Sequence, residues 1–259
     1  MLAKKSLGQN FLRDKNIIKK IVNLVDVKNR NILEIGPGTG ALTEEIIKKN
    51  PKTLTLIEKD NRLYENLKDT YFNEKNIKII NQDILKYDLD KLKKKNLIIF
   101  GNLPYNISSQ ILVKIIKMKN LSTKLKDVVF MFQKELGEKI IADFPSKNYG
   151  RLSILVNLRL IHINKFNVSS NCFYPKPKVD STIIHFKPKT KIKYEIINIE
   201  NLEKITSIFF SNKRKIIKKN MKKILNEKKI NLIKNLNLNL RPENLSPDTY
   251  YKITNLFEN

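Results

Sequence analysis

A glycine-rich segment, residues 34–40 (EIGPGTG), has the composition of a turn that approaches a ligand closely. Glycine permits a tight turn, and the helix expected behind it presents unbonded N–H groups. Gly36 and Gly38 are therefore candidate ligand contacts. The next expected strand ends in Glu58, where a carboxylate can accept hydrogen bonds from both hydroxyls of a ribose. Together these features predict a cofactor that contains a nucleoside, and NAD and S-adenosylmethionine both fit.

A second carboxylate follows the next apolar segment of the chain. Gln82 and Asp83 come directly after residues 77–80, which read as a strand. Ligands of open α/β sheets bind at the carboxyl ends of the strands, where this pair is expected. Asp83 could accept a hydrogen bond from the amino group of an adenine. It could equally cap a short helix that begins at Ile84, and both interpretations stay open.

Residues 101–106 (GNLPYN) combine an amide, a fixed bend and an aromatic ring. The exocyclic nitrogen of adenine is a poor nucleophile because its lone pair is delocalised into the ring. Two acceptors that hold its hydrogens, the Asn102 side-chain oxygen and the Leu103 carbonyl, would favour a tetrahedral nitrogen that can attack a methyl donor. Tyr105 can stack on the base. Because this segment follows a glycine-rich turn and several strands, it favours S-adenosylmethionine over NAD.

Short apolar segments alternate with segments of helical periodicity along the first part of the chain. The pattern predicts strands at residues 31–35, 53–57, 77–80, 97–100 and 128–132, and helices at residues 14–25, 41–49, 62–68 and 107–118. Such alternation is typical of a largely parallel sheet with both faces covered, here a Rossmann-like α/β fold. Residues 152–160 and 179–186 are expected to be an antiparallel pair of strands at the edge of the sheet.

The pattern becomes helical beyond residue 187. Pro188 and four lysines interrupt it near residues 187–193, which indicates a domain boundary. We therefore expect an α/β domain over residues 1–187 and a smaller, basic, all-helical domain over residues 188–259.

The composition of the 259 residues points to an anionic partner. Lys and Arg number 51 against 25 Asp and Glu, a net charge of +26, which predicts binding to a polyanion. Only seven of the basic residues are Arg, so biased base composition of the genome accounts for part of the charge, and charge clusters weigh more than the total.

The composition also excludes several classes of protein. One cysteine and two histidines exclude a disulfide framework and a cysteine zinc site. No apolar segment approaches the roughly 20 residues that cross a bilayer, and no signal-type apolar core follows the first residues. We expect a soluble, cytoplasmic protein with no metal and no membrane partner.

One charge cluster lies in the expected C-terminal domain. Residues 211–224 (SNKRKIIKKNMKKI) contain seven basic residues with apolar residues at helical spacing. The spacing predicts an amphipathic helix with a basic outer face, for which a solvated lysine face is the alternative to RNA binding. The candidate contacts with an RNA backbone are Lys213, Arg214, Lys215, Lys218 and Lys222.

Several separate motifs, in the same order, make the chain similar to the KsgA-type small-subunit ribosomal RNA adenine dimethyltransferases, within the wider family that includes the Erm resistance methyltransferases. The matching segments are residues 6–12 (SLGQNFL), 34–44, 58, 82–83, 101–108 (GNLPYNIS), 133–135, 149–153 (YGRLS) and 173–181 (FYPKPKVDS). The resemblance implies a class I methyltransferase fold and S-adenosylmethionine as cofactor. It also implies N6,N6-dimethylation of two adjacent adenosines in the 3′-terminal hairpin loop of small-subunit ribosomal RNA, linked to ribosome biogenesis.

The resemblance also implies roles for residues that would hold the cofactor. Asn10 and Leu12 correspond to an N-terminal segment that folds over it. Gly36 lies against its methionine part, Glu58 holds the ribose and Asp83 holds the adenine.

For the target base, the resemblance places Asn102 where methyl donor and base meet. Phe173 is implied as a second aromatic, which with Tyr105 would sandwich a flipped adenine. The family carries basic residues on its C-terminal helices in a similar place, which favours ribosomal RNA contact for residues 211–224. One departure from the family is Gly137, expected to weaken a helix by up to about 1 kcal/mol relative to Ala.

Two other functions remain open. An Erm-type methyltransferase of large-subunit ribosomal RNA would share the fold and cofactor, but such enzymes tend toward Ile at the position of Leu103, and residues 179–181 (VDS) also favour the small-subunit class. The other is a ribosome-assembly factor with methylation as a secondary checkpoint. The intact Glu58, Asp83 and Asn102 argue against an inactive enzyme. We expect a monomer.

Overall fold

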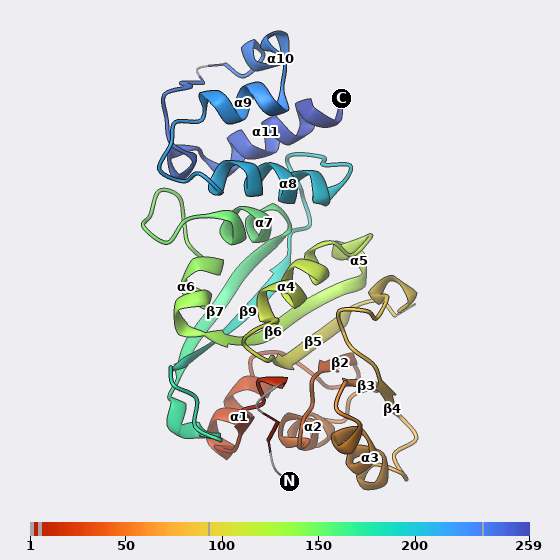
Figure 1. Ribbon diagram of the computed structural model, residues 1–259. Helices are drawn as coiled ribbons and strands as arrows, with labels where there is room; N and C mark the ends of the chain where they lie inside the picture. Colours follow the sequence, from red (N-terminus) through yellow and green to blue (C-terminus); the bar gives the residue numbers. More distant parts are fainter. Residues whose placement is uncertain (1–2, 5–6, 93, 235) are drawn as a thin grey trace. The chain divides into compact units, whose positions relative to one another are not determined.

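The computed structural model describes residues 3–4, 7–92, 94–234 and 236–259 (Figure 1). The chain divides into two compact units. Unit 1 comprises Met1–Gly137 and Leu160–Pro188, and unit 2 comprises Glu138–Arg159 and Lys189–Asn259.

Unit 1 is built on a mixed sheet. Its strands are β2 (Asn31–Ile35), β3 (Thr53–Glu58), β4 (Ile77–Asn81), β5 (Leu97–Asn102), β6 (Leu125–Gln133), β7 (Leu160–Val168) and β9 (Ser181–Pro188). Their order is β4-β3-β2-β5-β6-β9-β7. The pairs from β4 to β6 are parallel, whereas β9 is antiparallel to both β6 and β7. A separate two-stranded antiparallel sheet joins β1 (Phe11–Leu12) and β8 (Phe173–Tyr174).

Helices cover both faces of this sheet. They are α1 (Lys15–Val22), α2 (Ala41–Ile47), α3 (Asn61–Thr70), α4 (Ser108–Ile116), α5 (Leu121–Lys124) and the start of α6 (Lys134–Ile140). Ile21 of α1 and Ile46 of α2 share a buried cluster with Ile32 of β2. The next residue along β2, Leu33, points to the opposite face and is also fully buried, as is Ile111 of α4. The predicted Rossmann-like α/β fold is confirmed.

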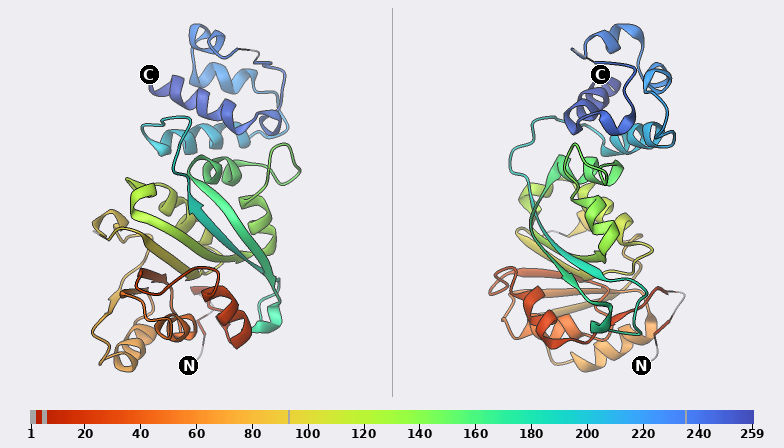
Figure 2. Two further views of the ribbon diagram at one scale, coloured as in Figure 1. Left: turned by 180° about the vertical axis from the view of Figure 1, so that it is seen from behind. Right: turned by 90° about the vertical axis from the view of Figure 1, so that its left-hand side faces the viewer.

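The edge of the sheet differs from the prediction. Residues 152–160 were expected to be a strand, but Arg151–Arg159 is the helix α7, and the strand that pairs with β9 is β7. The helix buries Ile154, Leu155, Val156 and Leu158, which follow one another too closely to show a helical period. Strand β7 gave no signal because most of its residues are exposed. β7 and β9 lie side by side in both views of Figure 2.

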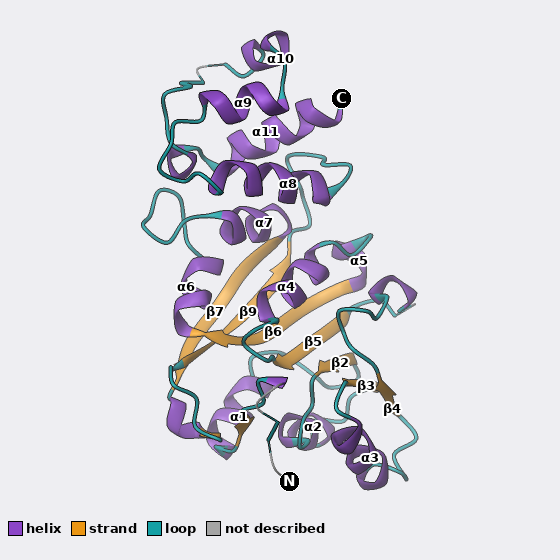
Figure 3. Cartoon of the chain, viewed as in Figure 1, coloured by secondary structure: helices purple, strands orange, loops and turns teal. Residues whose placement is uncertain are grey.

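The described residues of unit 2 form helices joined by loops and turns, with no strand among them (Figure 3). Its helices are the end of α6, α7, α8 (Ile199–Phe210), α9 (Lys218–Ile224), α10 (Glu227–Asn231) and α11 (Pro247–Glu258). The Tyr251 hydroxyl donates to the Ile154 carbonyl at 2.7 Å, and the Tyr149 hydroxyl donates to the Leu245 carbonyl at 2.9 Å. These contacts group residues 138–159 with the C-terminal helices, whereas the sequence analysis assigned them to the first domain.

The predicted helix over residues 211–224 is only partly correct. Helix α8 ends at Phe210, and α9 begins at Lys218. The chain turns between them because the amides of Ile217 and Lys218 donate to the carbonyls of Leu240 and Leu238. Ile217 is buried by this turn, while its neighbour Ile216 is exposed. The apolar residues of this segment therefore do not form one continuous helical face.

Within these described ranges, no helix is both long and apolar enough to cross a membrane.

Candidate active site

A cavity in unit 1 lies at the carboxyl ends of β2, β3, β4 and β5. Its lining includes residues 34–39, 57–59, 82–84 and 102–107, and the N-terminal residues 7–12 close over it. The chain runs from β2 out to β4 on one side and then to β5 and β6 on the other, so the cavity lies at the point where the strand order reverses. The predicted residues that it brings together are Asn10, Leu12, Gly36, Gly38, Glu58, Asp83, Asn102, Leu103 and Tyr105.

The glycine-rich turn after β2 is held by Glu58. Gly38 has a φ of 62°, which favours glycine, and its amide donates to Glu58 Oε2 at 3.1 Å. Glu58 Oε1 accepts from the amides of Lys59 and Asp60 at 2.9 and 2.8 Å. Burial raises the pKa of Glu58, although these three amide bonds oppose the rise. Oε2 receives a single bond among the described residues and keeps capacity for a ligand hydroxyl.

The space beside Gly36 is open. A Cβ at this position would meet no atom within 4 Å, and Gly36 has a φ of 65°. The turn therefore leaves room for a ligand beside the backbone, at the amino end of α2.

Asp83 lines the cavity and caps a turn, where the sequence left open a cap for a short helix or a contact with an adenine. Its Oδ1 accepts from the Leu85 amide at 2.9 Å, which caps a turn, and the residue also lines the cavity. Its Oδ2 lies 2.8 Å from Lys59 Nζ, and this lysine holds the pKa of Asp83 below its ordinary value. Lys59 was not a predicted site residue. Its position directly after Glu58 was the only sequence signal that could have indicated it.

Asn102 ends β5 with its amide oriented by the N-terminal segment. Its Nδ2 donates to the Asn10 carbonyl at 3.2 Å, and no hydrogen bond to Oδ1 occurs among the described residues. The oxygen is therefore available to accept from a ligand. A side chain at Gly101 would crowd Leu103, whose Cδ2 would lie 2.5 Å from a Cβ at that position. The Tyr105 ring is fixed by a 2.6 Å hydrogen bond between its hydroxyl and Ser181 Oγ.

Phe173 is not part of the cavity lining. It is 5% exposed, pairs with Leu12 across the β1–β8 sheet and packs in the cluster that contains Ile18. The next residue, Tyr174, is half exposed, and the Arg13 guanidinium lies 4.1 Å from the centre of its ring.

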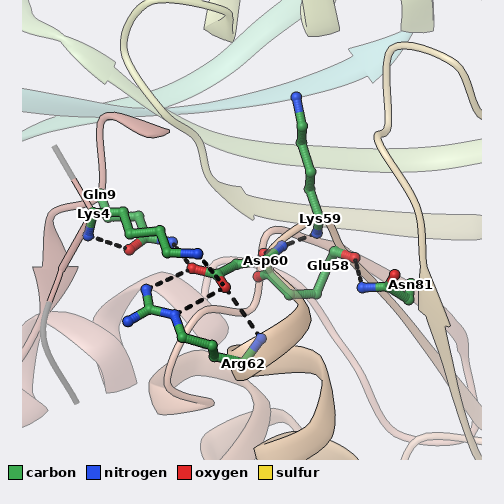
Figure 4. Close-up of polar contacts among 7 residues, drawn as sticks. All are labelled: Lys4, Gln9, Glu58, Lys59, Asp60, Arg62 and Asn81. Atoms are coloured by element: carbon green, nitrogen blue, oxygen red, sulfur yellow. Dashed lines mark hydrogen bonds and ion pairs between the residues drawn. The ribbon is translucent and has the colours of Figure 1, made fainter. Parts of the chain in front are cut away.

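Gln9 and Asp60 are two residues of the site that were not predicted from the sequence. Gln9 lines the cavity, and Asp60, two residues after Glu58, is the N-cap of α3. Their amide and carboxylate are hydrogen bonded at 3.0 Å (Figure 4). Gln9 lies in a segment that resembles the family, but its partner, 51 positions away, left no local pattern.

The five predicted RNA contacts are all exposed, in the turn before α9 and on α9 itself. Two of them have acidic partners: Lys213 Nζ lies 3.0 Å from Glu243, and Lys222 Nζ lies 3.3 Å from Glu227. Within the described part of the chain, Arg214, Lys215 and Lys218 have no ion pair, so their charges are available to a ligand.

No group of three His, Cys, Asp or Glu side chains that could hold a metal ion occurs in the described ranges.

The fold and the cavity define a Rossmann-like methyltransferase. The structure of a dimethyladenosine transferase from Plasmodium falciparum superposes with a TM-score of 0.77 and 27% identity, over 94% of this chain and 95% of that chain. The 23S rRNA methyltransferase ErmE shares the fold, with a TM-score of 0.70 and 21% identity, over 96% of this chain and 100% of the other.

The sequence assigns the chain to a family within that class. A family model described as ribosomal RNA adenine dimethylase matches residues 1–259. A relative from Pelagibacter ubique, named ribosomal RNA small subunit methyltransferase A, is 45% identical over 99% of this chain and 97% of its own length. The chain belongs to the ribosomal RNA adenine dimethylase family and is an S-adenosylmethionine-dependent methyltransferase. The resemblance found in the sequence is thereby confirmed.

Proposed function

We propose that this chain dimethylates N6 of two adjacent adenosines in the 3′-terminal hairpin loop of small-subunit ribosomal RNA, as a step of ribosome biogenesis. The observation that carries the proposal is Asn102 at the end of β5, with its amide nitrogen bound to Asn10 and its oxygen available. The full-length similarity to a small-subunit methyltransferase supports the choice of ribosomal subunit.

The cavity residues fit S-adenosylmethionine, which when bound supplies an electrophilic methyl group. Glu58 Oε2 can accept a hydrogen bond from a ribose hydroxyl. The open space beside Gly36 can accommodate the methionine part of the cofactor. The Asp83 carboxylate can accept a hydrogen bond from the adenine amino group once the Lys59 ammonium shares or releases Oδ2. Asn10 and Leu12 cover the cofactor from the N-terminal side, beside Gly38.

The target adenine needs a nucleophilic amino group. Asn102 Oδ1 and the Leu103 carbonyl each accept a hydrogen bond from this amino group, which directs the nitrogen lone pair toward the methyl group. The Asn10 carbonyl keeps the Asn102 amide from turning its nitrogen to the base. The proton is lost to water after the attack, so no strong base is required.

Tyr105, fixed by Ser181, stacks on the flipped base. Phe173 is the proposed second aromatic. Because it pairs with Leu12 and is buried in the core cluster that contains Ile18, that role requires β8 to move when RNA binds.

The backbone of the RNA is the proposed ligand of the turn before α9 and of α9 itself. Arg214, Lys215 and Lys218 are stronger candidates than Lys213 and Lys222, whose ammonium groups are already paired with glutamates. The enzyme is proposed to act in the cytoplasm and as a monomer. Analytical ultracentrifugation at the concentration of the activity assay measures the oligomeric state.

The direct test is transfer of labelled methyl groups from S-adenosylmethionine to purified unmethylated small subunits, with large subunits in parallel. We expect dimethyladenosine at two adjacent positions of the small-subunit RNA alone. Label on the large subunit would instead assign an Erm-type function. Cofactor binding with no label on either subunit would favour an assembly factor.

Asn102→Ala should lower methyl transfer by at least about a hundredfold, because one preorganised polar group at the reacting nitrogen is lost. Asn66→Ala, on the exposed side of α3, is the matched control and should retain full activity. Small subunits should still bind to the Asn102 variant. Equal transfer by the two variants would remove Asn102 from the mechanism.

A further inference from the structure

Asp60 is a buried carboxylate with more hydrogen bonds than a helix cap requires. It is 2% exposed, and among the described residues its side chain accepts five hydrogen bonds. Three come from Arg62, whose amide is capped by Oδ1 at 3.1 Å and whose guanidinium reaches Oδ2 at 2.9 Å. Asp14, the N-cap of α1, shows the simpler case: its Oδ1 caps the amides of Asn16 and Ile17, and its Oδ2 accepts only from the Cys172 thiol, at 3.8 Å, among the described residues.

The two remaining bonds come from the N-terminal segment (Figure 4). Gln9 Nε2 donates to Asp60 Oδ2 at 3.0 Å, and Lys4 Nζ lies 3.4 Å from Oδ1. Gln9 is itself oriented by the Lys4 amide, which donates to Gln9 Oε1 at 2.7 Å. Asp60 therefore fastens the N-terminal segment to the loop between β3 and α3.

This attachment lies beside the residues that close the cavity. Residues 7–12 line it, and Asn10, next to Gln9, holds the Asn102 amide through its carbonyl. On the other side, the Asp60 amide donates to Glu58 Oε1 at 2.8 Å. One residue thus contacts both the carboxylate proposed to bind the ribose and the segment proposed to cover the cofactor.

The hydrogen-bond partners of Asp60 explain why its buried carboxylate stays charged. The Arg62 guanidinium, with Gln9 and Lys4, holds the pKa of Asp60 far below its ordinary value against the effect of burial. A hydrogen bond to a charged acceptor is stronger than one to a neutral acceptor. The Asp60 carboxylate therefore binds the Gln9 amide more firmly than an asparagine at position 60 would.

We infer that Asp60 is a positioning residue that holds residues 7–12 over the cofactor through its hydrogen bond with Gln9. The inference rests on the proposed use of this cavity for S-adenosylmethionine. Loosening the bond should weaken cofactor binding and expose the N-terminal segment, while the fold of α3 stays intact.

Exchanging donor and acceptor tests the inference in the full-length protein. Gln9→Glu places two carboxylates together and should raise the Kd for S-adenosylmethionine about tenfold, as loss of a charge-assisted hydrogen bond does. Asp60→Asn keeps the cap of the Arg62 amide through its one oxygen, which turns its Nδ2 toward the Gln9 amide nitrogen, so the bond to Gln9 is lost and Kd should rise here too. The double variant has the carboxylate at position 9 and the amide at position 60, which reverses the direction of the bond. It should restore Kd to within about threefold of the parent.

Hydrogen exchange of residues 7–12 supplies the second readout. Their amides should exchange faster in Gln9→Glu and recover in the double variant. Arg62→Lys is the matched control, because it keeps a positive charge beside Asp60 and the backbone amide that Oδ1 caps, and it leaves the Gln9 bond; its effect on both readouts should be small.

A Gln9→Glu variant that binds the cofactor as the parent does, or a double variant without recovery, would overturn the inference. The proposed cofactor site is checked separately by Glu58→Ala. If that variant binds normally, the cavity proposal fails, whatever the exchange pair shows.

Discussion

At the scale of single residues, Gly137 shows that packing can outweigh helix propensity. In the helix α6, Ala would ordinarily be preferred to Gly by about 1 kcal/mol. A Cβ at this position would lie only 2.2 Å from Thr182 Cγ2. Thr182 is buried on β9, and its hydroxyl donates to the Phe166 carbonyl at 3.2 Å, so it has little freedom to move away. What looked like a departure that weakens a helix is a requirement of helix–sheet packing.

We therefore expect Gly137→Ala to lower the free energy of unfolding by about 1–3 kcal/mol, the usual cost of overpacking. Urea unfolding of the purified protein measures it. The matched control is Gly150→Ala, where the nearest atom to a new Cβ is 3.7 Å away and ordinary contact results. A more stable Gly137→Ala variant would show that the Thr182 side chain moves aside and that helix propensity outweighs the contact.

Glu34, in the cavity wall, makes stability depend on pH. It is 1% exposed, and burial raises its pKa from 4.5 to about 8, although the Thr43 hydroxyl donates to it at 2.7 Å. Between those two pKa values the folded chain holds a proton that the unfolded chain has lost. The free energy of unfolding should therefore fall as pH rises through this window, by up to about 1.4 kcal/mol per pH unit.

Glu34→Gln removes this ionisation. The stability of the variant relative to the parent should rise steadily between about pH 5 and about pH 8, and level off above. Urea unfolding of the ligand-free proteins across this range measures the difference, in which contributions from all other titrating groups cancel. A difference independent of pH would mean that Glu34 is ionised in the folded protein throughout.

At the scale of elements, the basic side chains of the turn before α9 and of α9 itself differ in whether an acidic side chain already pairs with them. Replacing Arg214, Lys215 and Lys218 by Ala should weaken binding to an RNA hairpin of the small-subunit 3′ terminus. Each lost phosphate contact should also reduce the slope of log K against log salt by about 0.7–0.9. The measurement is a binding titration at several salt concentrations.

The control removes the same charge from a different place. Lys28, Lys68 and Lys75 are exposed residues of unit 1 outside the cavity lining, and their triple Ala variant changes the net charge equally. If the two triple variants lose the same affinity and slope, RNA binding depends on total charge and not on this cluster.

At the scale of the whole molecule, the α/β unit was largely predictable because its central strands β2, β3, β5 and β6 are buried on both faces. Strands β2 to β6 appear as short apolar segments between amphipathic helices, and that alternation indicates a parallel sheet. The same alternation places Gly36, Glu58, Asp83 and Asn102 at one edge, since parallel strands all end on the same side. The chemistry of the cavity therefore followed from residue type and strand order.

The sequence alone thus determined the fold class, the cofactor and the edge of the sheet where the site lies, because each depends on local periodicity or on residues next to a strand end. Only the tertiary structure decided that residues 151–159 are a helix and that Phe173 lies in a core cluster. It also decided that Asp60 binds Gln9 and that Gly137 faces Thr182. The helix was missed because its buried residues are nearly consecutive and show no helical period. The other three features are contacts between residues far apart along the chain, and such contacts leave no trace in the local spacing of apolar and polar residues.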